Sequence, residues 1–158
     1  MKAVLFYGPE NIKYEDVRLR PLKKGEVLVK IMSALTCGTD VKTYRRGHPV
    51  LIKSIPSGFG HEFSGVVEKL GEGVTKFSVG DRVVAANSAP CGECFFCKRG
   101  EYNLCEHLDL LNGAYAEYII VPERIVEKNM LILPDDLSFD KAAFCEPLAN
   151  VVHGVERS

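Results

Sequence analysis

The amino-acid sequence predicts a mainly β fold, in the form of a small and partly open barrel or sandwich. Short β-rich segments recur along the chain as far as Val121, Gly and Pro residues separate them, and the helical patterns are brief. A length of 158 residues corresponds to one domain, or at most two. The composition, with 46% hydrophobic and 26% charged residues, is that of an ordinary globular protein.

Each β-rich segment is bounded by turn-forming residues, among them Gly8-Pro9, Lys24-Gly25 and Gly71-Glu72-Gly73. Two other segments interrupt the pattern. Residues 36–46 are polar and predict a short helix, and residues 90–107 are too rich in Cys, Gly and charge to be held by a hydrophobic core. The predicted strands span residues 2–7, 12–17, 26–32, 63–70, 82–86 and 114–121.

The last part of the sequence predicts two helices. Ser138 can cap a helix over residues 139–145, with Asp140 favourably placed in its first turn. Pro147 suits the first turn of a second helix over residues 147–157. Because that helix runs to the end of the sequence without a glycine cap or a following strand, we expect the chain to be a fragment of a longer protein.

Charge and hydropathy exclude several classes of function. The chain has 20 basic and 21 acidic side chains, so electrostatics give no reason to bind nucleic acid or an anionic membrane. No apolar run approaches the roughly 20 residues of a transmembrane helix, or the roughly 7–15 residues of a secretory signal. We therefore expect a cytoplasmic protein, in which six cysteines indicate metal or thiol chemistry and not disulfides.

Four of the cysteines form a C-x2-C-x2-C-x7-C motif, namely Cys91, Cys94, Cys97 and Cys105. Four thiolates at this spacing can close a tetrahedral zinc site, which would be structural because it leaves no open position. An iron–sulfur cluster is an alternative, but in a ferredoxin run the fourth cysteine follows after three residues and precedes proline. The remaining interpretation is that these are four ordinary buried thiols that bind no metal. We name residues 90–107 the cysteine lobe.

Three further segments carry possible metal ligands. They are Cys37-Gly38-Thr39-Asp40, Gly60-His61-Glu62 and Cys145-Glu146-Pro147. Each is weak alone, because a lone Cys is most often a small core residue. Together they offer the thiolate, imidazole and carboxylate ligands of a catalytic zinc, which keeps one position open for water or substrate.

These motifs resemble those of the zinc-dependent medium-chain alcohol dehydrogenases. The pattern G-H-E-x2-G-x5-G-x2-V over residues 60–74 is similar to the zinc signature of that family, and Gly80-Asp81-x-Val83 and the cysteine lobe follow in the same order. The resemblance covers essentially the whole chain. It implies that residues 1–158 form a GroES-like catalytic domain, a partly open β-barrel with short helices. Glu146-Pro147-Leu148 is more similar to the sorbitol and threonine dehydrogenase branch.

By this resemblance, Cys37, His61 and Glu62 would hold a catalytic zinc, and Glu146 would be a ligand that exchanges with water or substrate. Cys145 is adjacent to Glu146. Neighbouring helix residues point about 100° apart, so both cannot readily face one metal. We favour Glu146 as the ligand and expect Cys145 to be a buried thiol.

The resemblance also implies roles in proton and hydride transfer. Thr39 would hydrogen-bond the substrate oxygen, and Asn150 would lie near the nicotinamide. Lys42 stands where the family often has a histidine as the outer member of the proton relay; it could equally be a solvated helix residue. The chain lacks the G-x-G-x-x-G fingerprint of a dinucleotide site, since Gly71-Glu72-Gly73 does not continue the pattern.

We therefore expect the catalytic part of a zinc-dependent NAD or NADP dehydrogenase for a small alcohol or polyol. Its Rossmann domain is absent from this chain, so the chain alone should be inactive, and the full-length enzyme should be a homo-oligomer, a dimer or a tetramer. One alternative is a zinc-binding structural or interaction module without catalysis, which would hold one zinc per chain where the enzyme would hold two. A co-chaperonin-like barrel is another, but it explains neither set of ligands.

Overall fold

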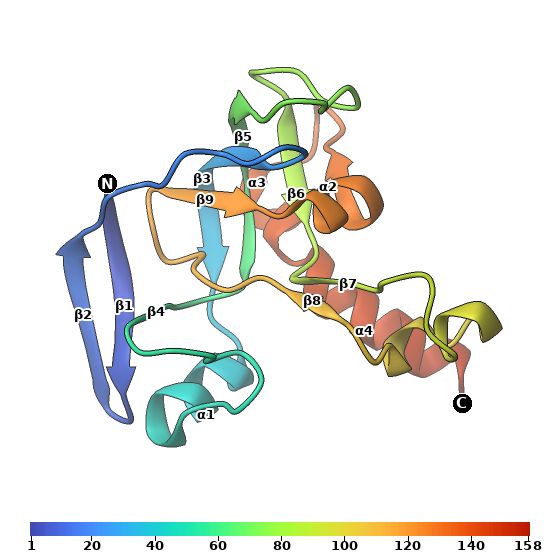
Figure 1. Ribbon diagram of the computed structural model, residues 1–158, viewed down its shortest axis with the longest axis horizontal. Helices are drawn as coiled ribbons and strands as arrows, with labels where there is room; N and C mark the ends of the chain where they lie inside the picture. Colours follow the sequence, from blue (N-terminus) through green and yellow to red (C-terminus); the bar gives the residue numbers. More distant parts are fainter.

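A computed structural model describes all residues from Met1 to Ser158 (Figure 1). The chain folds into three antiparallel sheets with the strand orders β2-β1-β4, β10-β6-β5-β3-β9 and β7-β8. The strands are β1 (Lys2–Gly8), β2 (Asn11–Asp16), β3 (Val27–Leu35), β4 (Ser57–Gly58), β5 (Glu62–Leu70), β6 (Arg82–Ala85), β7 (Ser88–Ala89), β8 (Asp109–Leu110), β9 (Tyr118–Val121) and β10 (Met130–Ile132).

Four helices accompany the sheets. The cysteine lobe connects β7 to β8 and contains two short 3-10 turns, Cys97–Arg99 and Tyr102–Leu104. In Figure 1 the hairpin of β1 and β2 lies at one end of the molecule, and the lobe and the C-terminus lie at the other. No helix combines the length and the apolarity needed to cross a bilayer. The helices are α1 (Gly38–Arg46), α2 (Glu123–Asn129), α3 (Phe139–Ala143) and α4 (Cys145–Glu156).

The five-stranded sheet carries the hydrophobic core. Alternate residues of its strands face one side, and β3 contributes Val27 and Val29, both fully buried. Phe63 and Val67 of β5 and Val83 of β6 pack into the same cluster. The helix α2 closes this core with Ile125 and Val126.

The pairing of β3 with β5 contains two irregularities, and a glycine is required at one of them. The register shifts between Leu28 and Val29 and again between Ile31 and Ser33. Gly65 lies opposite Ile31, and a Cβ atom on it would clash with the carbonyl oxygen of Lys30. The glycine of the sequence motif therefore lets two strands approach closely.

The six predicted strands and the predicted helices are present, with some corrected bounds. The predicted strand 114–121 begins only at Tyr118, because the preceding residues bond elsewhere: Ala3 bridges to Ala116, and the Tyr115 N–H donates to Phe59 O. The second C-terminal helix begins at Cys145, two residues before its predicted start, and Pro147 still lies in its first turn. Sequence reasoning did not predict β4, β7, β8, β10 or α2.

Candidate metal centres

The paired ends of β3 and β5 bring Cys37 and His61 together. Leu35, the last residue of β3, is opposite Glu62, the first residue of β5. Cys37 follows β3 and His61 precedes β5, so segments 24 residues apart in sequence meet at one edge of the sheet. The Cys37 Sγ atom lies 3.4 Å from His61 Nε2. One ligand atom each from Cys37, His61 and Glu62 lies within 4.8 Å of the others.

The thiol of Cys37 is fixed by the start of α1. Cys37 is the N-cap of this helix, and its Sγ accepts the backbone N–H of Thr39 at 3.2 Å. Asp40 completes a capping box by accepting the Cys37 N–H at 3.0 Å. Burial raises the pKa of the Cys37 thiol, and hydrogen bonds to the thiol from the backbone N–H groups of Asp40 and Thr39 act against that rise. A helix N-terminus and a bound cation both favour the thiolate, so this thiol is placed for metal binding.

Asp40 also determines which nitrogen of His61 is available. Its Oδ1 atom lies 3.1 Å from His61 Nδ1, and both residues are buried. A neutral imidazole that donates Nδ1–H to this carboxylate leaves the Nε2 lone pair directed at the Cys37 sulfur. Burial acts to raise the pKa of Asp40, but the hydrogen bonds from His61 and the Cys37 N–H outweigh it, so the pKa of Asp40 is lowered.

Sequence reasoning named Asp40 only as part of the segment from Cys37 to Asp40 and gave it no role of its own. The structure places it behind His61 as a hydrogen-bond acceptor. The sequence did contain a signal for the capping role of Asp40: a carboxylate three residues after an N-cap lies in the first helical turn, where it can accept a hydrogen bond from the cap. Tyr115, whose hydroxyl lies 3.0 Å from Asp40 Oδ2, was not identified, because nothing in the sequence connects it to a residue 75 positions away.

Glu62 and Glu146 differ in how close they lie to Cys37 and His61. Glu62 is 3% exposed, and burial raises its pKa. Glu146 lies in the first turn of α4 and is not part of the tight group of three ligand atoms. Its charge nevertheless contributes to raising the pKa of both His61 and Glu62, and it lines a neighbouring cavity of about 330 Å³.

The remaining predicted residues lie on α1 and α4. Thr39 is half-buried in the first turn of α1, and Lys42 is exposed on the same helix. Asn150 lines the cavity and donates a hydrogen bond of 2.9 Å to Glu146 Oε1. Cys145, which was expected to be buried, is half-buried: it packs against the small apolar cluster of Val84, Leu133 and Ala142 and also lines the cavity.

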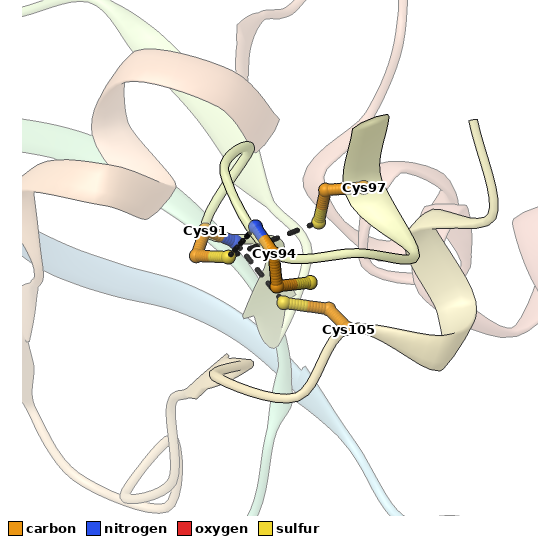
Figure 2. A group of neighbouring side chains, drawn as sticks. All are labelled: Cys91, Cys94, Cys97 and Cys105. Atoms are coloured by element: carbon orange, nitrogen blue, oxygen red, sulfur yellow. Dashed lines mark hydrogen bonds between the residues drawn. The ribbon is translucent and has the colours of Figure 1, made fainter. Parts of the chain in front are cut away.

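The four lobe cysteines converge on one point (Figure 2). Their sulfur atoms all lie within 4.8 Å of one another, and those of Cys91 and Cys97 are 3.9 Å apart. Backbone N–H groups point at the sulfurs: that of Cys91 bonds Cys105 Sγ at 3.2 Å, and that of Cys94 bonds Cys91 Sγ at 3.4 Å. The backbone N–H of Glu93, with lesser contributions from other groups, lowers the pKa of Cys91 to about 6.

This geometry fits a tetrahedral metal ion. With Zn–S bonds of about 2.3 Å, the sulfurs of a tetrahedral site are about 3.8 Å apart, close to the separation of Cys91 and Cys97. Cys37, His61 and Glu62, which we call the Cys-His-Glu cluster, fit a different kind of zinc site. Its mixed S, N and O donors are typical of a zinc site that keeps a position open.

Comparison with known proteins shows the family to which the chain belongs. The sequence model of the family 'alcohol dehydrogenase GroES-like domain' matches residues 23–135 of this chain. The chain is 35% identical over its whole length to the sorbitol dehydrogenase of Bacillus subtilis (strain 168), of which it covers 45%. It is 39% identical to the L-threonine 3-dehydrogenase of Bacillus velezensis, with 91% of this chain and 42% of that protein aligned.

Solved structures show the same relationship. Galactitol-1-phosphate dehydrogenase from Escherichia coli superimposes with a TM-score of 0.86 at 31% identity, over 99% of this chain and 44% of that one. For 2R,3R-butanediol dehydrogenase from Bacillus subtilis the TM-score is 0.85 at 32% identity, over 99% and 47% of the two chains. The chain thus spans less than half the length of these relatives. With its fold, its four-cysteine lobe and the match over most of its length, the chain belongs to the GroES-like domain family of the medium-chain zinc alcohol dehydrogenases.

Proposed function

We propose that residues 1–158 form the catalytic domain of a zinc-dependent dehydrogenase that oxidises a small alcohol or polyol with NAD or NADP. The observation that carries this proposal is the Cys-His-Glu cluster, in which Asp40 sets His61 to present Nε2 beside the Cys37 sulfur. The named activities of the relatives support the substrate class, since they include a sorbitol and an erythritol/L-threitol dehydrogenase.

The chain's own residues would hold and orient the reactants. Cys37, His61 and Glu62 would bind zinc, and Glu146 would be a ligand that exchanges with water or substrate. Zinc held there would supply a Lewis acid that lowers the pKa of the substrate hydroxyl. The hydroxyl of Thr39, two residues after Cys37, would hydrogen-bond the substrate oxygen and take its proton while passing on its own. That proton would reach solvent by way of the exposed Lys42 amine or water.

The hydride would leave to a nicotinamide held by a separate domain of the whole protein. Asn150 faces the same cavity as Glu146 and would lie beside that nicotinamide. We propose that the whole protein is a homo-oligomer and that the 158-residue chain by itself turns over no alcohol. The cysteine lobe, residues 90–107, would hold a second, structural zinc, because four thiolates leave no position for substrate.

The test is the activity of the whole protein with sorbitol, erythritol, L-threonine and 2,3-butanediol, with NAD⁺ and NADP⁺ in turn. We expect oxidation of at least one of these substrates, and a fall of at least 100-fold in kcat/KM for Cys37→Ser. Cys145→Ser is the matched control for loss of a thiol beside the cavity: Cys145 packs partly into an apolar cluster and is not proposed as a ligand, so this variant should retain most of the activity. A zinc-binding interaction module would show no turnover in any of these assays, and that result would refute the proposal.

A further inference from the structure

Tyr115 is held firmly in place between β8 and β9. Its backbone N–H donates to Phe59 O at 2.9 Å, and its carbonyl accepts the N–H of Val4 at 2.7 Å. Its ring packs edge-on against Phe59 at a centroid distance of 5.5 Å. Gly60, with φ of +85°, lies directly under this ring, and a Cβ atom there would be 2.5 Å from it. The glycine before His61 thus leaves space for the tyrosine.

The hydroxyl of Tyr115 reaches the junction of β3 and α1. It lies 2.8 Å from Thr36 Oγ1, 3.0 Å from Leu35 O and 3.0 Å from Asp40 Oδ2. A phenol has one proton to donate, and of these three acceptors only Asp40 is charged. Because a hydrogen bond to a carboxylate is roughly twice as strong as one between neutral groups, Asp40 is the preferred acceptor.

Asp40 therefore has defined partners on both carboxylate oxygens. Oδ2 receives the Cys37 N–H and the Tyr115 hydroxyl, and Oδ1 faces His61 Nδ1. Two donors on one oxygen fix the plane of the carboxylate, and that plane determines where the other oxygen points. The carboxylate is only 4% exposed, so water cannot readily replace a donor that is lost.

We propose that Tyr115 is a positioning residue for the Cys-His-Glu cluster: its hydroxyl fixes the Asp40 carboxylate, which in turn orients the imidazole of His61. This inference rests on the proposed function, because it assumes that His61 binds a metal. The ring contacts with Phe59 and Gly60 do not require the hydroxyl. Tyr115→Phe therefore keeps the packing and removes the hydroxyl, with its contacts to Asp40, Thr36 and Leu35.

The experiment measures metal affinity at the cluster directly. Zinc and Co²⁺ are titrated into the metal-free protein against a competing chelator, and binding at the cluster is identified as the part that Cys37→Ser removes. Loss of an outer hydrogen-bond partner of a metal-bound histidine typically weakens affinity 10–100-fold. We expect Tyr115→Phe to weaken the cluster's affinity by about 10-fold, to alter its Co²⁺ absorption bands, and to leave the lobe unchanged.

Tyr118→Phe is the matched control, because Tyr118 lies three residues away in β9 and its hydroxyl makes no hydrogen bond within the chain. It should bind metal as the unaltered protein does. If Tyr115→Phe stays within twofold of this control with unchanged Co²⁺ bands, the inference is wrong. If the unaltered protein binds no metal that depends on Cys37, it is the proposed function that fails.

Two further variants test the route through Asp40. In an Asp40→Asn background, Tyr115→Phe should add little to the loss, since partners in one network are not additive. Thr36→Val should leave the affinity unchanged. Full additivity with Asp40→Asn, or an equal loss in Thr36→Val, would show that the hydroxyl acts on the end of β3 and not through Asp40.

Discussion

Glu26, immediately before β3, shows how one buried carboxylate joins several segments. It is 6% exposed and receives two hydrogen bonds from the Arg20 guanidinium, at 2.6 and 2.8 Å, and one from the Lys23 N–H. Arg20 holds the pKa of Glu26 below its ordinary value, against the opposing effect of burial. The backbone carbonyl of Glu26 also accepts the N–H of Gly71, the third glycine of the zinc signature.

The lowered pKa of Glu26 predicts a pH-dependent contribution to stability. A carboxylate whose pKa is lower in the folded state stabilises the fold above its unfolded pKa of about 4.3 and loses this effect as the pH falls through the folded value. At pH 7 we expect Glu26→Gln to lower the free energy of unfolding by about 1–2 kcal/mol, a modest loss because half of Arg20 is in solvent.

Urea unfolding at several pH values checks this prediction. The difference between Glu26→Gln and the unaltered protein should shrink below about pH 4. Glu68→Gln, an exposed glutamate of β5, should be neutral throughout. A difference that stays constant from pH 7 to pH 3 would contradict the assigned role of the ion pair.

At the scale of the elements, the helix α2 anchors both ends of the cysteine lobe. At the lobe's entry, Lys128 Nζ donates to Pro90 O at 2.8 Å, and Asn129 Nδ2 donates to Ser88 O at 2.7 Å. At its exit, Arg124 donates to His107 O at 2.9 Å. The opposite face of α2 is buried in the core. The helix therefore connects a loop without a hydrophobic core to the main sheet.

The double variant Arg124→Gln/Lys128→Gln should loosen this connection. We expect the free energy of unfolding to fall by about 1–2 kcal/mol, from the loss of two exposed hydrogen bonds and the Arg124–Asp109 ion pair. The loss should be no larger, because the thiolates are untouched and keep their zinc. Calorimetry and zinc analysis of the same samples check both expectations. Lys98→Gln is the control, since this lobe lysine makes no hydrogen bond through its side chain. Unchanged stability in the double variant would contradict the anchoring role.

Element type was predictable where the pattern is long, and the missed elements are short. The nine residues of β3 alternate in burial with a period of two, and the nine residues of β5 form a long segment whose first four residues are all buried. The strands β4, β7 and β8 have two residues each and hold no period at all. Pro122 followed by Glu123 is a recognisable start for the helix α2. Its seven residues contain only one buried pair, Ile125 and Val126, which is too few to show a helical period.

For the whole molecule, the two sets of metal ligands differ in how much of the fold they need. The lobe ligands lie within 15 consecutive residues, from Cys91 to Cys105, so their spacing alone predicted one site. Cys37 and His61 meet only because β3 pairs with β5, a contact that the spacing does not contain. Their grouping was predicted through the family resemblance, and the partners Asp40 and Tyr115 required the structure.

The same difference predicts how the two metal ions are lost. The Cys-His-Glu cluster needs distant packing and has an oxygen ligand, whereas the lobe is local and all thiolate, which zinc prefers. A chelator should therefore remove the cluster's zinc first.

A graded chelator titration with a colorimetric zinc reporter tests this account most directly. The protein should release about two zinc ions per chain in two phases. Cys37→Ser should abolish the early phase, and Cys94→Ser the late one. A total of one zinc ion per chain, or loss of the late phase in Cys37→Ser, would contradict the assignment of the two centres.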